Sequence, residues 1–270
     1  MYNPYFELHK EFKAAGARIL LSSGQACVLL GIAAFSKDGD WIIHEDEDSL
    51  RAVLAVLNGK CASYRLGAPL DLKFLSAGWT SHFEFFREEL RVRVDFVSRP
   101  PRISDPAMLW GKAAARNGID LVDIEDLLLL KQTRRPRDYA VIGALAEVCG
   151  FNENIPFIAL RFLQDYDLLK IAVGRWPDEA ASVDRKAVRL LLSGASRHEV
   201  VAALAIEQDE RIEADNQRIN ASLSKTEPYQ RAFSQRSATW RRMGTPLIEQ
   251  HEELLQLANR HLTAKGIASA

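Results

Sequence analysis

The chain has 270 residues, of which 47% are hydrophobic and 26% are charged, as in an ordinary globular protein with a buried core. Its 35 Lys and Arg residues nearly balance its 36 Asp and Glu residues, which excludes a uniformly basic nucleic-acid wrapper. The apolar runs are too short to span a bilayer and the N-terminus has no secretory pattern, so we expect a cytoplasmic protein without membrane contact. The three cysteines form no CxxC pair, which favours reduced thiols over a disulfide scaffold or a zinc finger.

Helix and strand signals alternate in the first half of the chain. Apolar spacing and turn residues predict helices over residues 3–16, 25–35 and 47–57, and strands over 18–21, 41–43, 80–86 and 90–97. In the last of these strands Val92, Val94 and Phe96 share one face, while Arg93 and Asp95 lie on the other. This strand therefore packs one face on a core and presents a polar face to a cleft or to solvent.

The second half of the chain is helical in pattern. Helices are expected over residues 123–132, 136–149, 156–173, 183–193, 196–224 and from 245 onward. We expect two domains, with residues 1–150 forming a mixed α and β domain and residues 151–270 a C-terminal all-helical domain.

Three carboxylates are spaced in a way that suggests metal chemistry. Asp38 and Asp40 project to the same side of an extended segment, and Asp95 lies on the polar face of another strand. Three carboxylates that meet on a sheet repel one another unless a hard cation such as Mg²⁺ lies between them. Two such ions would orient an attacking hydroxyl and stabilise a leaving pyrophosphate.

A small-residue turn precedes this segment. Ser22, Ser23 and Gly24 stand at the start of a predicted helix, where free N–H groups and the helix dipole favour the phosphates of a nucleotide.

These residues, in this order, resemble the nucleotidyltransferase superfamily related to DNA polymerase beta, including stand-alone prokaryotic and abortive-infection-type enzymes. Residues 21–26 resemble the small-residue motif, in which Ser23 replaces the first glycine, and residues 36–42 resemble the T-x-D-x-D strand. Residues 93–96 resemble the strand with the third metal-binding carboxylate. Residues 127–139 resemble a downstream basic element in which Lys131 lines the nucleotide side of the cleft.

The resemblance implies an α+β fold with a small mixed β-sheet flanked by helices, plus the helical domain. It implies an Mg²⁺-dependent transfer of a nucleoside monophosphate from an NTP to an acceptor hydroxyl. Asp38, Asp40 and Asp95 would be catalytic and metal-binding, and Ser22, Ser23, Gly24 and Lys131 would bind the nucleotide. The acceptor is expected to be an RNA or tRNA, in a toxin-like role, although a small molecule or a protein hydroxyl fits the same resemblance. The oligomeric state is not readable from the sequence.

Each signal also has a simpler structural interpretation. Asp38 and Asp40 suit a polar turn, Ser22 suits a helix N-cap, and Lys131 suits a solvated helix end. The basic stretch 211–242 contains aromatic residues that suit RNA stacking, but packing of those residues on the first domain is the favoured interpretation. As an alternative function, the chain is a non-catalytic module that binds a nucleotide or a partner.

Overall fold

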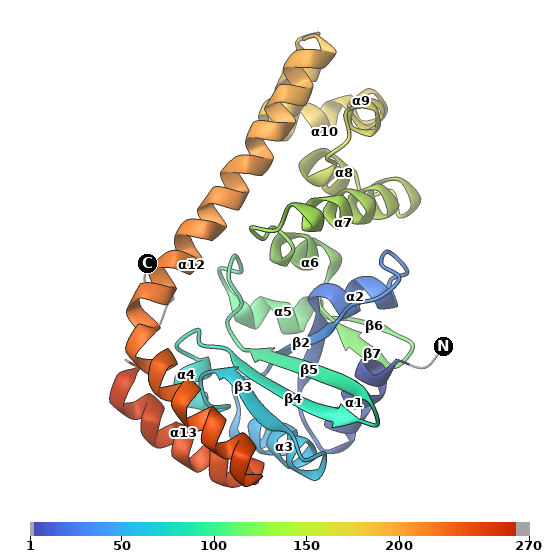
Figure 1. The fold of residues 1–270 in the computed structure, drawn as a ribbon. Coiled ribbons are helices and arrows are strands. Elements are labelled where there is room, and N and C mark those ends of the chain that lie inside the picture. Colours follow the sequence, from blue (N-terminus) through green and yellow to red (C-terminus); the bar gives the residue numbers. More distant parts are fainter. Residues whose placement is uncertain (1–2, 263–270) are drawn as a thin grey trace. The chain divides into compact units, whose positions relative to one another are not determined.

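The structure of the chain is a computed structural model that describes residues 3–262. Its contacts divide the chain into two compact units. Met1–Asp123 and Asn220–Ala270 form the first, here called the sheet unit, and Ile124–Ile219 form the second, here called the helical unit. Figure 1 shows a mixed sheet with helices in the first and helices in the second, so the expected α+β class is confirmed.

The sheet unit contains seven described strands in the spatial order β3-β4-β5-β2-β1-β7-β6. Their bounds are β1 Ile19–Ser22, β2 Asp38–Ile43, β3 Ser63–Gly67, β4 Ser81–Arg87, β5 Leu90–Val97, β6 Ala114–Arg116 and β7 Ile119–Leu121. The helices of this unit that lie within the first half of the chain are α1 Pro4–Ala14, α2 Ser23–Leu29, α3 Glu47–Gly59, α4 Leu72–Leu75 and α5 Pro106–Lys112. The sheet is mixed, because β2 runs parallel to β5 and antiparallel to β1.

The helical unit is built from short helices. They are α6 Ile124–Leu130, α7 Pro136–Glu147, the π-helical turn η1 Val148–Asn152, α8 Pro156–Phe162, α9 Tyr166–Arg175, α10 Pro177–Ser182 and α11 Lys186–Leu192. The single helix expected over residues 156–173 is wrong, because Asp165 ends the extended link after α8 and caps α9 by accepting a hydrogen bond from the Leu168 N–H.

The chain ends in two further helices, α12 Arg197–Met243 and α13 Leu247–His261. The stop expected near residue 224 is wrong, because α12 continues through Pro228. A proline inside a helix costs about 3 kcal/mol. Burial of Tyr229, Phe233 and Trp240 at helical spacing beyond it offsets that cost.

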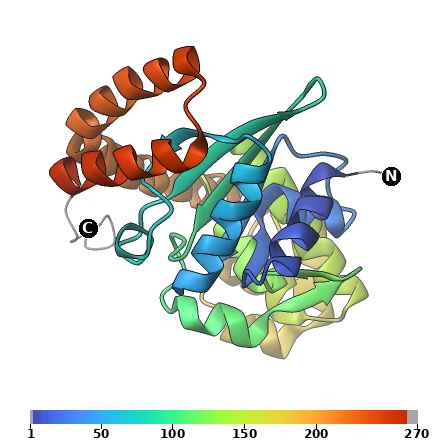
Figure 2. The same cartoon turned by 90° about the horizontal axis from the view of Figure 1, so that it is seen from below.

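The division of the chain differs from the expected domains 1–150 and 151–270. The last residues return to the sheet unit, where α13 packs against α3 and β3 (Figure 2). The Gln250 side chain accepts a hydrogen bond from the Tyr64 N–H at 3.0 Å, and the Tyr229 hydroxyl donates to the Gly67 carbonyl at 2.8 Å. At the other boundary, α7 packs against η1 and α8, so residues 124–150 belong with the helices that follow them.

The core of the sheet unit lies beneath the predicted polar strand. Trp41 and Phe96 stack with ring centroids 5.7 Å apart, and Phe12 of α1 meets both rings edge-on at 5.5 Å. Val92, Val94 and Phe96 are buried as expected, while Arg93 and Asp95 alternate with them on the opposite face of β5. Among the helices described in residues 3–262, none has both the length and the apolar character that crossing a bilayer requires.

Candidate active site

The strand register brings the predicted carboxylates to one face of the sheet. In the parallel β2–β5 pair, Asp40 lies opposite Asp95 and Asp38 lies opposite Arg93. Opposed residues share a face, and so do residues two apart on one strand. Asp38, Asp40 and Asp95 are therefore on one polar face, as the sequence predicted.

Arg65 and His82 both lie against the Asp95 carboxylate. The His82 Nδ1 lies 2.8 Å and an Arg65 guanidinium nitrogen 2.9 Å from the same carboxylate oxygen, Oδ1. Burial raises the pKa of Asp95, but the hydrogen bond and charge of His82, together with Arg65, outweigh burial and hold the pKa below its usual value. Asp95 is therefore an ionised group that already has the Arg65 guanidinium and the His82 imidazole as partners.

His82 is held in a fixed orientation. Its Nε2 lies 2.7 Å from the Thr80 hydroxyl, while Nδ1 faces Asp95. With the imidazole neutral, this arrangement assigns the proton to Nδ1 and lets Nε2 accept from the threonine. His82 thus links the Thr80 hydroxyl to Asp95.

Arg65 is a site residue that sequence reasoning missed. It lies on β3, a strand that the sequence analysis did not predict, and it reaches Asp95 across β4. The only signal for it is a short run, residues 63–66, ahead of Gly67 and Pro69.

Asp38 has an unsatisfied oxygen. Its Oδ1 is enclosed and has no hydrogen-bond partner among the described residues, and the nearest cation is an Arg93 guanidinium nitrogen 3.7 Å away. A buried carboxylate oxygen without a partner is costly. The Asp38 oxygen therefore fits an additional cation at this position.

Asp38, Asp40 and Asp95 together do not form a ready-made metal site. Within the part of the chain that the structure describes, no three His, Cys, Asp or Glu side chains are grouped so that they could hold a metal ion together. The contacts of Asp95 explain this, because its Oδ1 faces Arg65 and His82. Asp95 would join Asp38 and Asp40 at a cation only by sharing or exchanging its present partners.

The small-residue turn lies next to Asp40. Ser22, the last residue of β1, is directly opposite Asp40 and occupies the N-cap position of α2, as the simpler interpretation expected, although its side chain makes no cap hydrogen bond. Ser23 has a left-handed backbone with φ of +51°, a conformation that glycine adopts at lower cost. A Cβ on Gly24 would lie 2.2 Å from the Ser36 hydroxyl, so only glycine fits there.

Lys131 is buried rather than solvated. In the helical unit its ammonium lies 3.5 Å from Asp138, whose carboxylate also accepts from Arg135 at 2.9 Å. Both the Lys131 and Asp138 side chains are nearly inaccessible. Asp138 is thus a structural partner of Lys131 and Arg135, and the interpretation of Lys131 as a solvated helix end is wrong.

The aromatic residues of the basic stretch 211–242 pack inside the protein, as the favoured interpretation expected. Tyr229, Phe233 and Trp240 are buried against the sheet unit, with 3–6% of each residue exposed. They do not present open faces for stacking on bases. Tyr229 and Phe233 also line an open pocket of about 580 Å³, and Arg65 and His82 are among its other lining residues. This pocket therefore adjoins the partners of Asp95.

Comparison of the chain with protein-family models, with curated proteins and with solved structures found no match.

Proposed function

We propose that the chain is a metal-dependent nucleotidyltransferase of the superfamily that its motifs resemble. The observation that carries this proposal is the register of β2 and β5, which sets Asp40 beside Asp95 and Asp38 on the same face. Two strands separated by about fifty residues in the sequence thus present three carboxylates in one place, next to the Ser22–Gly24 turn.

In this proposal Asp38 and Asp40 would hold Mg²⁺, and the Asp38 oxygen that lacks a hydrogen bond would be one of its ligands, in place of its 3.7 Å ion pair with Arg93. Bound Mg²⁺ supplies charge stabilisation to the phosphates and lowers the pKa of the acceptor hydroxyl. Asp95 would complete the carboxylate set only by giving up contact with Arg65 or His82, and the backbone N–H groups that follow Ser22 would bind the β and γ phosphates. Lys131 is left out of these contacts, because its ammonium is buried against Asp138.

The pocket beside Arg65 and His82 is the proposed place for the acceptor. Its volume suits a small molecule or one nucleoside of an RNA, and two of its lining residues touch Asp95. An RNA or tRNA acceptor and a toxin-like role remain predictions from the resemblance.

A second candidate function is a non-catalytic module that binds a nucleotide or a partner through the same face. The contacts of Asp95 with Arg65 and His82 favour it, because a carboxylate that already has a guanidinium and an imidazole as partners gains less from a metal ion.

The test is transfer of an α-labelled NTP, with Mg²⁺, to total cellular RNA. Wild-type protein is compared with Asp38→Asn and with Asp48→Asn, the latter a control at an exposed aspartate on α3. Labelled RNA from wild type and Asp48→Asn, lost in Asp38→Asn, would support the enzyme. Mg²⁺-dependent NTP binding without transfer to RNA, protein or small-molecule acceptors would favour the binding module. Undiminished transfer by Asp38→Asn would contradict the proposed metal site.

A further inference from the structure

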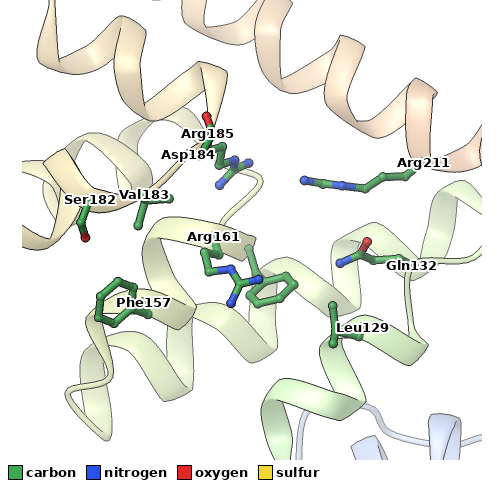
Figure 3. Close-up of a pocket in the computed structure, with 10 residues that line it drawn as sticks. Leu129, Gln132, Phe157, Arg161, Ser182, Val183, Asp184, Arg185 and Arg211 are labelled. Carbon is green, nitrogen blue, oxygen red and sulfur yellow. The ribbon is translucent and has the colours of Figure 1, made fainter. Parts of the chain in front are cut away.

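A second pocket, in the helical unit, is lined by arginines. Its volume is about 520 Å³, and Arg161, Arg185 and Arg211 all lie on its walls. These residues come from three places, namely α8, the residue before α11, and α12. Figure 3 shows Arg185 and Arg211 directed toward each other across the pocket, with Arg161 and Gln132 at its sides.

Arg185 is a buried cation with incomplete hydrogen bonding. Its Nε donates to Glu207 at 2.8 Å and one terminal nitrogen donates to the Leu160 carbonyl at 3.0 Å. The other terminal nitrogen, Nη2, is enclosed and has no hydrogen-bond partner among the described residues. Only 6% of the residue is exposed, so water does not satisfy that donor, and the group is costly unless an acceptor joins it.

The charges around this pocket do not cancel. Arg185 and Arg211 both face Glu207, but the Arg211 guanidinium is 3.9 Å away, beyond hydrogen-bond range. One carboxylate thus serves two guanidinium groups. Arg161, which is half-exposed, has its own partner in Glu125 at 2.8 Å, and the exposed Asp184 carboxylate pairs with Arg189. Because Arg185 and Arg211 share the single negative charge of Glu207, one positive charge is left over between them.

The remaining walls suit the organic part of a ligand. Phe157 is 49% exposed although its ring is large and apolar, and Leu129 and Val183 extend the apolar wall. Binding pockets of this size usually combine apolar walls with a few convergent polar groups.

From these observations we propose that the arginine pocket of the helical unit binds the phosphate group of a small organic phosphate. Two guanidinium groups that come from different helices can donate to separate oxygens of a tetrahedral phosphate, whereas one guanidinium fork satisfies a planar carboxylate. Arg161 and Arg211 contact the ligand, and Arg185 contributes its charge from within the wall. The Phe157 side carries the organic group. Every residue in this argument belongs to the helical unit, so the site does not depend on the proposed transferase activity.

The test is isothermal titration of the full-length protein with inorganic phosphate, phenyl phosphate and acetate, at constant ionic strength and without divalent cations. We expect phosphate to bind, phenyl phosphate to bind more tightly, and acetate to bind at least about tenfold more weakly than phosphate. Arg211→Gln should weaken phosphate binding about tenfold. Arg231→Gln, at an exposed arginine also on α12, is the matched control and should bind as the wild type does.

The folding of each variant is checked by circular dichroism, and Arg161→Gln, at a half-exposed position, replaces Arg211→Gln if that variant does not fold. Equal phosphate affinity in wild type and the folded pocket variant would overturn the proposal. So would equal binding of acetate and phosphate, or an equal loss in Arg231→Gln. A short RNA oligonucleotide serves as a further arm. If it binds through Arg211 while both small phosphates do not, the small-ligand site is refuted.

Discussion

Acidification should destabilise the sheet unit through one buried histidine, His9 on α1. The His9 ring is fully buried, the Trp41 indole N–H points at Nδ1 at 3.2 Å, and the Asp120 backbone N–H points at Nε2 at 3.2 Å. A neutral imidazole accepts at one nitrogen, and a protonated imidazole accepts at neither. Burial accordingly lowers the pKa of His9 from 6.5 to about 4.

The sign and size of the effect follow from this pKa. Above about pH 6.5 the imidazole is neutral in both the folded and the unfolded chain, so stability is unaffected. As the pH falls below that value the unfolded chain takes up the proton first, and stability is lost until His9 titrates in the folded chain near pH 4. Lowering the pKa of His9 by roughly 2.5 corresponds to a total loss of about 3.4 kcal/mol in the free energy of unfolding. About 2.5 kcal/mol of this is lost between about pH 7 and pH 4.5.

Urea unfolding of the wild type and of His9→Gln, each at about pH 7 and at about pH 4.5, isolates the contribution of His9 to the free energy of unfolding. Other groups titrate in both proteins, and the glutamine keeps one acceptor for Trp41, so the difference between the two pH dependences belongs to His9. We expect the wild type to lose about 2.5 kcal/mol more than the variant. An equal loss in the two proteins would refute the reasoning.

Two further substitutions test features of the fold. Ser23→Gly should stabilise the protein by about 1 kcal/mol in urea unfolding, because glycine adopts the left-handed φ of Ser23 at lower cost, and an unchanged or lower stability would show that the serine side chain makes a compensating contact. Glu207→Leu should destabilise the helical unit by about 3–5 kcal/mol, because it leaves the buried Arg185 unpaired. The double variant Glu207→Leu with Arg185→Leu should recover part of that loss in the same assay, and no recovery would contradict the charge argument.

Local pattern predicted the parts of the site that depend on strand alternation. The spacing of Val92, Val94 and Phe96 identified the buried face of β5 and placed Asp95 opposite it, and the Asp38–Asp40 spacing placed both carboxylates on one side of β2. The strands expected over residues 80–86 and 90–97 are likewise confirmed as β4 and β5, which pair with each other antiparallel.

Contacts between distant residues were not predictable in this way. Arg65 meets Asp95 only because β3 pairs with β4 and β4 with β5, and the strand that carries Arg65 is short and ends at Gly67. The apolar stripe of α13 indicates that the helix packs, but not on which surface, so its return to β3 and α3 was missed. Periodicity gives the face of an element, whereas the partner of that face is set by the whole chain.

The register between β2 and β5 determines two features at once. It sets the packing of the aromatic core on one side of the sheet and the positions of the aspartates on the other. Neighbouring residues on a strand point to opposite faces, so an insertion or deletion of one residue in β5 would turn Asp95 toward the rings of Trp41 and Phe12 and move Phe96 to the polar side. A misaligned sheet would have to bury a carboxylate and expose an aromatic ring. The strand alignment that packs the aromatic rings of Trp41, Phe12 and Phe96 is therefore the same alignment that places the three aspartates on one face.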